Sequence, residues 1–256
     1  MHYDQLSPSA RKIAKSISGL VADDPLLIQV IQRMGAWDGT LATASPEAAI
    51  YEVFLDQVTA LMVGRYLGDT DLGQFYKGHG PSYEWVQSML VKPGQSGDNP
   101  GFGEAQDEVW QQALSAAITV LSKKLGPGVE DWSWGKLHQL TYSHPLGNFK
   151  PLRQYFNRGP FPTGGDGTTV WTAHSGHHDL NSSLMFGPPY RMIVDLGDLR
   201  NFVSLLAPGQ SGLPASRHYN DQVKAWFTGD YHLMLFYRAD VEKETEGRLE
   251  LLPEGG

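Results

Sequence analysis

The first 125 residues show apolar positions at the 3.6-residue spacing that is typical of amphipathic helices. Three predicted helices begin in the same way, with Ser7-Pro8, Asp24-Pro25 and Ser45-Pro46. The Ser or Asp side chain can accept a hydrogen bond from the first turn, and Pro fixes a helical φ at the first position. The sequence therefore predicts three capped helix starts in its first quarter.

The apolar positions that follow these starts fall on one helix face, and we expect them to lie in the core. The third run is long enough for about six turns, and Gly64 and Gly68 mark its end. The expected core positions are Ile13, Ile17, Leu20 and Val21 in the first helix, Leu26, Leu27, Val30, Ile31 and Met34 before Gly35 in the second, and Ile50, Val53, Phe54, Val58, Leu61 and Met62 in the third.

Two further helices are expected before residue 126. Tyr83–Val91 is a short apolar run, and Lys92–Gly103 is rich in Gly, Pro and polar residues, which predicts an exposed loop. Glu104–Leu125 has the clearest helical pattern, and Lys123-Lys124 and Gly126-Pro127 end it as the helix dipole and backbone geometry favour.

Residues 131–170 show neither helical nor strand periodicity, so we expect an ordered loop with one helical turn near Lys136–Leu140. The segment contains Trp132, Trp134, His138 and His144 beside two clusters of Gly and Pro. Long ordered loops often carry function, and they also serve as structural crossovers. Both interpretations stay open at this point.

Beyond this segment, β-branched and aromatic runs bounded by Gly, Pro, Asn and Asp predict strands. The second and third runs should pair as a hairpin through the turn at Asp195–Asp198, and a helix is expected at His218–Phe227. The predicted strands are Thr168–Ala173, Tyr190–Leu196, Phe202–Ala207, Tyr231–Tyr237 and a weak Arg248–Leu252.

Helices followed by strands predict an α+β fold. We expect a helical part, 1–130, and a loop-rich β-sheet part, 131–256, which together form one structural unit.

Composition excludes several classes of function. The chain has 20 basic and 28 acidic residues, a formal net charge of −8, so neither a nucleic acid nor an anionic membrane is an expected partner. It has no cysteine, which excludes disulfides, thiolate catalysis and Cys-ligated metals but leaves the compartment open. The N-terminus has no apolar signal region and no run approaches the length of a membrane span, so we expect a soluble chain with no export signal of its own.

The run His174–Asp179 holds three imidazoles and a carboxylate, which are good metal ligands. On a strand His174 and His178 would share a face while His177 pointed away, and Gly176 would already break the strand. The spacing matches no known metal site. We therefore expect an exposed loop and assign no metal ligand.

Ser211, His218 and Asp221 have the residue types of a nucleophile, a base and an orienting acid. The local sequence is not a G-x-S-x-G elbow, and a glycine-lined turn explains the same residues. The glycine-rich run Thr163–Thr169 has neither a phosphate-binding Lys nor a following helix, so it is not a P-loop. We assign no catalytic and no cofactor-binding residue.

The bond between Gly167 and Thr168 is a further candidate, as a self-cleaving junction that would free a threonine nucleophile. Cleavage there would leave 89 residues, too few for a four-layer fold. We therefore expect the bond to remain intact.

A series of motifs resembles the C-terminal part of the penicillin acylase family, and the resemblance covers nearly the whole chain. The motifs are D-x-x-S-x-x-A at Asp4–Ala10, WDG at Trp37–Gly39, SPEAA at Ser45–Ala49, W-x-W-G-x-L-H at Trp132–His138, HPLG at His144–Gly147, the Gly- and Pro-rich run from Gly159 to Val170, PYRMIVDLGD at Pro189–Asp198, PGQSG at Pro208–Gly212 and HYNDQ…W at His218–Trp226.

The resemblance implies an N-terminal-nucleophile amidohydrolase with an αββα core, cut from a precursor into two chains. In that family the longer chain begins with a serine, whose α-amino group is the base, and an asparagine with backbone N–H groups holds the oxyanion. It also implies a periplasmic or secreted location. Here the sequence begins Met1-His2-Tyr3, and the family's nucleophile, oxyanion asparagine, arginine and calcium ligands belong upstream of the matching segment.

Two hypotheses follow from this resemblance. In the first, the chain is the C-terminal segment of an acylase that cleaves N-acyl compounds, such as β-lactam side chains or acyl-homoserine lactones, and it completes the fold without supplying the nucleophile. Its expected partners are the remaining acylase segments or further copies of itself, and it needs no cofactor of its own. In the second, it is a noncatalytic binding or interaction module derived from the family.

Overall fold

The computed structural model describes residues 2–79, 83–91, 105–174 and 187–252. The chain divides into two compact units, Met1–Pro188 and Pro189–Gly256, and each is described by itself. The loop predicted at Lys92–Gly103 lies outside the described residues.

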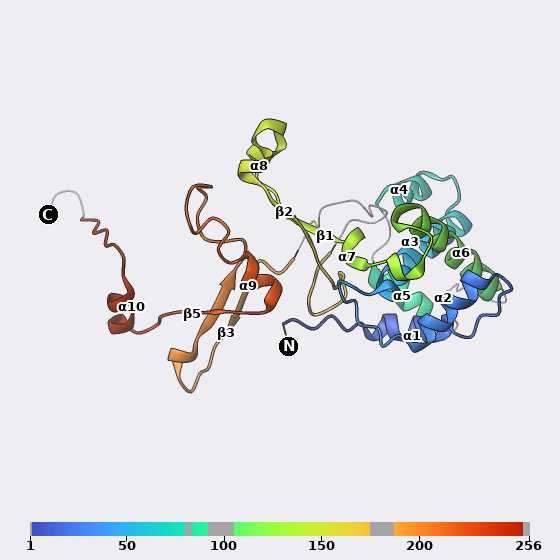
Figure 1. The fold of residues 1–256 in the computed structure, drawn as a ribbon, viewed down its shortest axis with the longest axis horizontal. Coiled ribbons are helices and arrows are strands. Elements are labelled where there is room, and N and C mark those ends of the chain that lie inside the picture. Colours follow the sequence, from blue (N-terminus) through green and yellow to red (C-terminus); the bar gives the residue numbers. More distant parts are fainter. Residues whose placement is uncertain (1, 80–82, 92–104, 175–186, 253–256) are drawn as a thin grey trace. The chain divides into compact units, whose positions relative to one another are not determined.

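The described part of the first unit contains six longer helices, which Figure 1 shows gathered in one body. All three predicted caps are confirmed, because Ser7 Oγ accepts the N–H of Ala10 at 3.2 Å, Asp24 Oδ1 that of Leu27 at 2.8 Å, and Ser45 Oγ that of Ala48 at 3.0 Å. The helices are α1 (Pro8–Ile17), α2 (Pro25–Ala36), α3 (Pro46–Tyr66), α4 (Asp71–His79), α5 (Tyr83–Val91) and α6 (Gln106–Leu125). The sequence did not predict α4, whose nine residues include two glycines.

Helix α3 is the centre of the first unit. Its residues 48–56 are all buried, and it packs most extensively against α6, where the rings of Phe54 and Trp110 lie 5.5 Å apart. Helix α1 packs against α2 and α5. A helix enclosed on every face would normally be wholly apolar, yet Glu52 and Asp56 lie in this buried stretch.

The segment 131–170 contains the expected helical turn, but part of it forms a β-hairpin, which the sequence did not predict. After η2 (Val129–Asp131) and α7 (Trp134–Leu137), strand β1 (Gln139–Tyr142) pairs antiparallel with β2 (Arg158–Pro162). The register is irregular between Leu140 and Tyr142, and β1 buries one residue, Leu140. Such a short, irregular pair shows no alternating pattern in the sequence.

Three short turns connect the two strands of this hairpin: η3 (Pro145–Asn148), η4 (Lys150–Leu152) and α8 (Arg153–Phe156). Figure 1 shows α8 at the end of the hairpin, away from the helices of the first unit. At the start of β2, Gly159 has a φ of 116°, and a Cβ there would lie 2.6 Å from the carbonyl oxygen of Leu140. A residue with a side chain would therefore be strained at this position.

The second unit contains one antiparallel sheet in the order β3 (Tyr190–Ile193), β4 (Val203–Leu206), β5 (His232–Leu233). The predicted hairpin is confirmed, with Tyr190 opposite Leu206 and Ile193 opposite Val203. Helix α9 (Val223–Thr228) buries Val223 and Trp226.

Three predictions in the second unit were too long or wrong. The strand predicted at Tyr231–Tyr237 is reduced to β5, and Tyr237 is the N-cap of α10 (Arg238–Glu244). The weak strand at Arg248–Leu252 does not form, since its leucines are exposed and pair with no strand. The helix expected from His218 begins at Val223, because the preceding residues form turns that bond back to the 208–216 loop.

Together the helices and the two small antiparallel sheets confirm the predicted α+β class. The division at residue 130 and the single structural unit stay predictions. Across the part of the chain that the structure describes, no helix has the length and apolar character needed to cross a membrane.

Candidate functional site

A buried cluster of carboxyl groups lies where the loop after β2 meets α3. Glu52, Asp56 and Asp166 are each 3–5% exposed. Asp166 Oδ1 accepts the N–H groups of Thr168 and Thr169 at 2.7 and 2.8 Å, and the hydroxyl of Thr168 donates to the same carboxylate at 3.0 Å. These bonds close a turn, so the strand predicted at Thr168–Ala173 does not form.

Glu52 and Asp166 share a hydrogen bond, and the environment decides which one holds the proton. Burial raises the pKa of Glu52 well above its ordinary value, and the charges of Asp166 and Asp56 raise it further. Burial also raises the pKa of Asp166, but its bonds to Thr168 and Thr169 and its bond with Glu52 lower it. We conclude that Asp166 is the acceptor of its turn while Glu52 is protonated and donates to it.

Trp134 and His138 of the 131–170 segment have structural roles. The rings of Trp134 and His138 stack 4.4 Å apart, and Trp134 Nε1 donates to the carbonyl of Gly165 at 2.9 Å. His138 Nδ1 lies 3.1 Å from the carbonyl oxygen of Thr163. Burial lowers the pKa of His138 to about 4, although the carbonyls of Thr163 and Ala173 oppose the shift. A neutral, enclosed imidazole of this kind ties β1 to the loop after β2 and favours the structural interpretation of the crossover.

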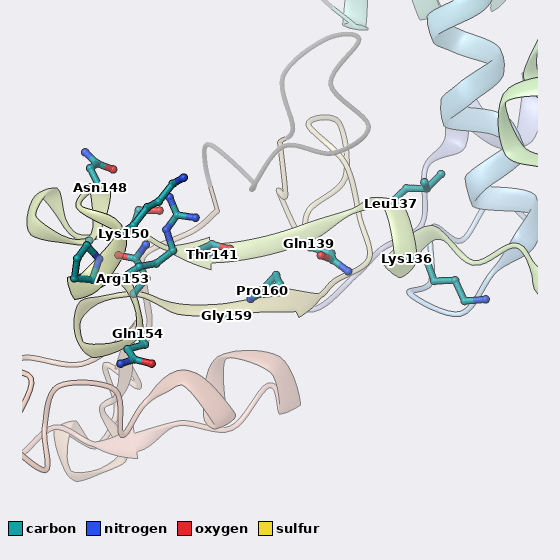
Figure 2. Close-up of a pocket in the computed structure, with 14 residues that line it drawn as sticks. Lys136, Leu137, Gln139, Thr141, Asn148, Lys150, Arg153, Gln154, Gly159 and Pro160 are labelled. Carbon is teal, nitrogen blue, oxygen red and sulfur yellow. The ribbon is translucent and has the colours of Figure 1, made fainter. Parts of the chain in front are cut away.

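An open groove follows the hairpin and has a volume of ≈ 1060 Å³. Figure 2 shows Gln139 and Thr141 on β1, Pro160 on β2, and Lys150 beside Arg153 at the end of the hairpin, with Lys136 at the opposite end. The lining is polar and contains three cations and no carboxylate. The lining residues are Lys136, Leu137, Gln139, Thr141, Ser143, Gly147, Asn148, Lys150, Pro151, Arg153, Gln154, Asn157, Gly159 and Pro160.

The residues of the possible triad share one cavity of ≈ 720 Å³ in the second unit, but they are not connected as a triad. His218 Nδ1 pairs with Asp221 at 2.7 Å. The other ring nitrogen of His218 accepts from Arg217 Nε at 2.9 Å, and Ser211 Oγ accepts the N–H of Leu213 at 3.1 Å. The base nitrogen therefore faces a cation and not the serine hydroxyl, so the geometry does not activate Ser211.

His177, His178 and Asp179 lie outside the described residues, and the described chain contains no cluster of three side chains that could hold a metal. The hydroxyl of Thr168 is engaged by Asp166, and Gly167–Thr168 lies in a turn and does not open a strand.

Sequence reasoning missed the carboxyl cluster and the groove. The signal for the first was present, because Glu52 and Asp56 lie one turn apart inside a run that is apolar on both sides. The groove is formed by turns whose conformation the sequence did not reveal.

Comparison with known proteins shows the family of the chain. The family model for penicillin amidase matches residues 1–243. The chain is 30% identical over 235 residues to the acyl-homoserine lactone acylase QuiP of Pseudomonas aeruginosa, and 27% identical over 262 residues to the penicillin acylase 2 proenzyme of Pseudomonas sp. strain SE83. These alignments cover 84% and 99% of this chain but 28% and 32% of the relatives.

The fold also has a counterpart among solved structures. A thermostable penicillin G acylase from Alcaligenes faecalis matches 99% of this chain and 48% of its own with a TM-score of 0.55 and 17% identity. This likeness shows the fold alone. With a family match over nearly all of its length, the chain belongs to the penicillin amidase family of amide hydrolases.

Proposed function

We propose that this chain is the C-terminal segment of an acylase that hydrolyses the amide bond of N-acyl compounds, and that it completes the fold without supplying the nucleophile. The observation that carries the proposal is the family match over residues 1–243, combined with a span of about a third of the curated relatives' length. Because two of the relatives are acyl-homoserine lactone acylases, acyl-homoserine lactones are the first substrates to test.

The geometry of the described residues supports a structural role. The hydroxyls of Ser211 and Thr168 are both engaged in local turns, and His218 faces Arg217. Trp132 and Trp134 of the 131–170 segment pack into the core of the first unit. A segment of this kind contributes helices and strands to a larger protein, whose other segments would hold the reacting groups.

Exposed apolar surface further supports an association with other segments. Strand β3 exposes Tyr190, Met192 and Ile193, and two-thirds or more of the Leu196, Leu213 and Leu249 side chains is exposed. Apolar side chains exposed on an edge strand favour association with another segment.

The test is to compare the chain alone with the chain co-expressed with the acylase segments that precede it in its gene. We expect the chain alone to leave N-acyl-homoserine lactones and penicillins intact, because it offers no activated nucleophile. Co-expression should give a stable complex that releases the free acid.

The Ser211→Ala variant serves as the matched control. If the chain alone hydrolysed an amide and Ser211→Ala abolished the turnover, the chain would have its own catalytic site and the proposal would be wrong. A stable monomer with no affinity for the other segments would instead support the noncatalytic module.

A further inference from the structure

Charge is segregated along the chain in a way that the overall balance conceals. The 34 residues from 132 to 165 contain Lys136, Lys150, Arg153 and Arg158 but no Asp or Glu, although the whole chain has a net charge of −8. The structure places three of these cations along the groove on the hairpin. The hairpin is therefore a basic element in an acidic protein.

Two of these cations have no partner within the described chain. Lys136 Nζ donates to the carbonyl of Asp131 at 2.6 Å, but the side chains of Lys150 and Arg153 form no hydrogen bond or ion pair with any described residue. Figure 2 shows their side chains next to each other at the end of the groove. Two adjacent cations repel each other, and a carboxylate between them would relieve that repulsion.

The end of the hairpin, residues 143–157, is here called the tip, and it exposes apolar side chains beside these cations. Phe149 is 65% and Tyr155 59% exposed, and Leu146 and Leu152 are also exposed. Among the described residues of the tip, Gly147 is the one that is buried. The tip therefore has no core of its own.

Polar contacts nevertheless give the tip a defined conformation. Asn157 Oδ1 accepts the N–H of His144 at 3.0 Å, and the rings of His144 and Phe156 stack 4.7 Å apart. A Cβ on Gly147 would collide with the Asn157 side chain, so glycine permits this closure. An ordered surface that combines exposed aromatic rings with free cations has the composition of a protein interface.

We infer that the tip and its groove form the docking surface for an acidic segment of the rest of the acylase. The inference rests on the proposed function and adds where the segments meet and what charge the partner carries. Lys150 and Arg153 would pair with carboxylates of that segment, while Phe149 and Tyr155 would pack on apolar side chains next to them. A second copy of the chain is a poorer occupant tip to tip, because two basic tips would repel each other.

The experiment measures the binding of the full chain to the acylase segments that precede it in its gene, immobilised on a sensor surface. The test variant is Lys150→Glu with Arg153→Glu. The matched control is Lys12→Glu with Lys224→Glu, which makes the same change of charge at exposed positions of α1 and α9. Because Lys150 and Arg153 are exposed and unpaired, the melting temperature of the free test variant should equal that of the wild type.

We expect the tip variant to bind at least about tenfold more weakly than the wild type, with a smaller dependence on salt, and the control to bind like the wild type. In the wild-type complex, Lys150 should also be protected from acetylation while Lys12 stays reactive. The inference would be overturned if both variants bound the acylase segments equally weakly, or if Lys150 stayed reactive in the complex. In either case the complex itself would still support the proposed function.

Failure of the proposed function has a different result, in which the wild-type chain captures no acylase segment at all. Light scattering then tests whether a second copy of the chain is the occupant. Self-association that the tip variant abolishes would show a second copy at the tip and would overturn the acidic acylase segment as its partner.

Discussion

Replacing Glu52 by Gln should make the protein more stable than the wild type, and this difference should grow as the pH rises. In the folded chain Glu52 is buried, hydrogen-bonded to Asp166 and close to Asp56, and its pKa is raised. In the unfolded chain its pKa is about 4.3. Above that pH the unfolded state loses a proton that the folded state keeps, so wild-type stability falls with pH until the raised pKa is passed.

The size of the effect follows from proton linkage. Each pH unit in this window costs the wild type at most about 1.4 kcal/mol while Glu52 keeps its proton, so between pH 4.5 and 6.5 the variant should gain stability over the wild type by at most about 2.5 kcal/mol. At pH 4.5 the two proteins should be similar, because the Gln side chain can donate its own N–H to Asp166 in place of the Glu52 proton.

Urea unfolding followed by tryptophan fluorescence at several pH values measures this difference. The matched control is Glu108→Gln, which makes the same substitution at an exposed position of α6 and should show no such gain over the wild type between pH 4.5 and 6.5. If the curves for Glu52→Gln and the wild type stayed parallel from pH 4.5 to 7, Glu52 would not hold its proton in the folded state and the reasoning would be refuted.

Three further outcomes are expected. His138 should act with the opposite sign: its pKa is about 4 when folded and about 6.5 when unfolded, so it removes about 3 kcal/mol of stability as the pH falls between these values, and His138→Gln should abolish that loss in the same urea assay. The intact mass should show no cleavage at Gly167–Thr168, and a separate piece beginning at Thr168 would contradict the turn that Asp166 forms. Zinc and calcium should leave the melting temperature unchanged, since a ligand at 100 times its dissociation constant would add about 2.7 kcal/mol; an upward shift lost on replacing the three histidines of residues 174–178 by alanine would reveal a metal site.

The helical part was predictable because its signals are local. A Ser or Asp followed by Pro determined three helix starts, and α5 has the predicted bounds, Tyr83–Val91. These signals act within one helical turn, so they are legible without knowledge of the rest of the fold.

The strands and the candidate site depend on contacts between distant residues. The run that begins at Thr168 is rich in β-branched residues, which favour a strand. The side chain of Asp166 instead accepts the N–H groups of Thr168 and Thr169 and closes a turn. The hairpin forms because Leu140 meets Phe161 across about 20 residues of intervening turns. No local pattern encodes these pairings. The protonation state of Glu52 likewise depends on Asp166, which lies more than 100 positions away in the sequence.

The tip has one further consequence, which concerns amide hydrogen exchange. A segment that is held by a few hydrogen bonds and one ring stack opens without unfolding the core, so its amides should exchange with solvent much faster than those of α3. A partner seated on the tip would block these openings. The slowing of exchange at residues 143–157 would then report assembly directly, residue by residue, even where the enclosed amides of α3 do not change.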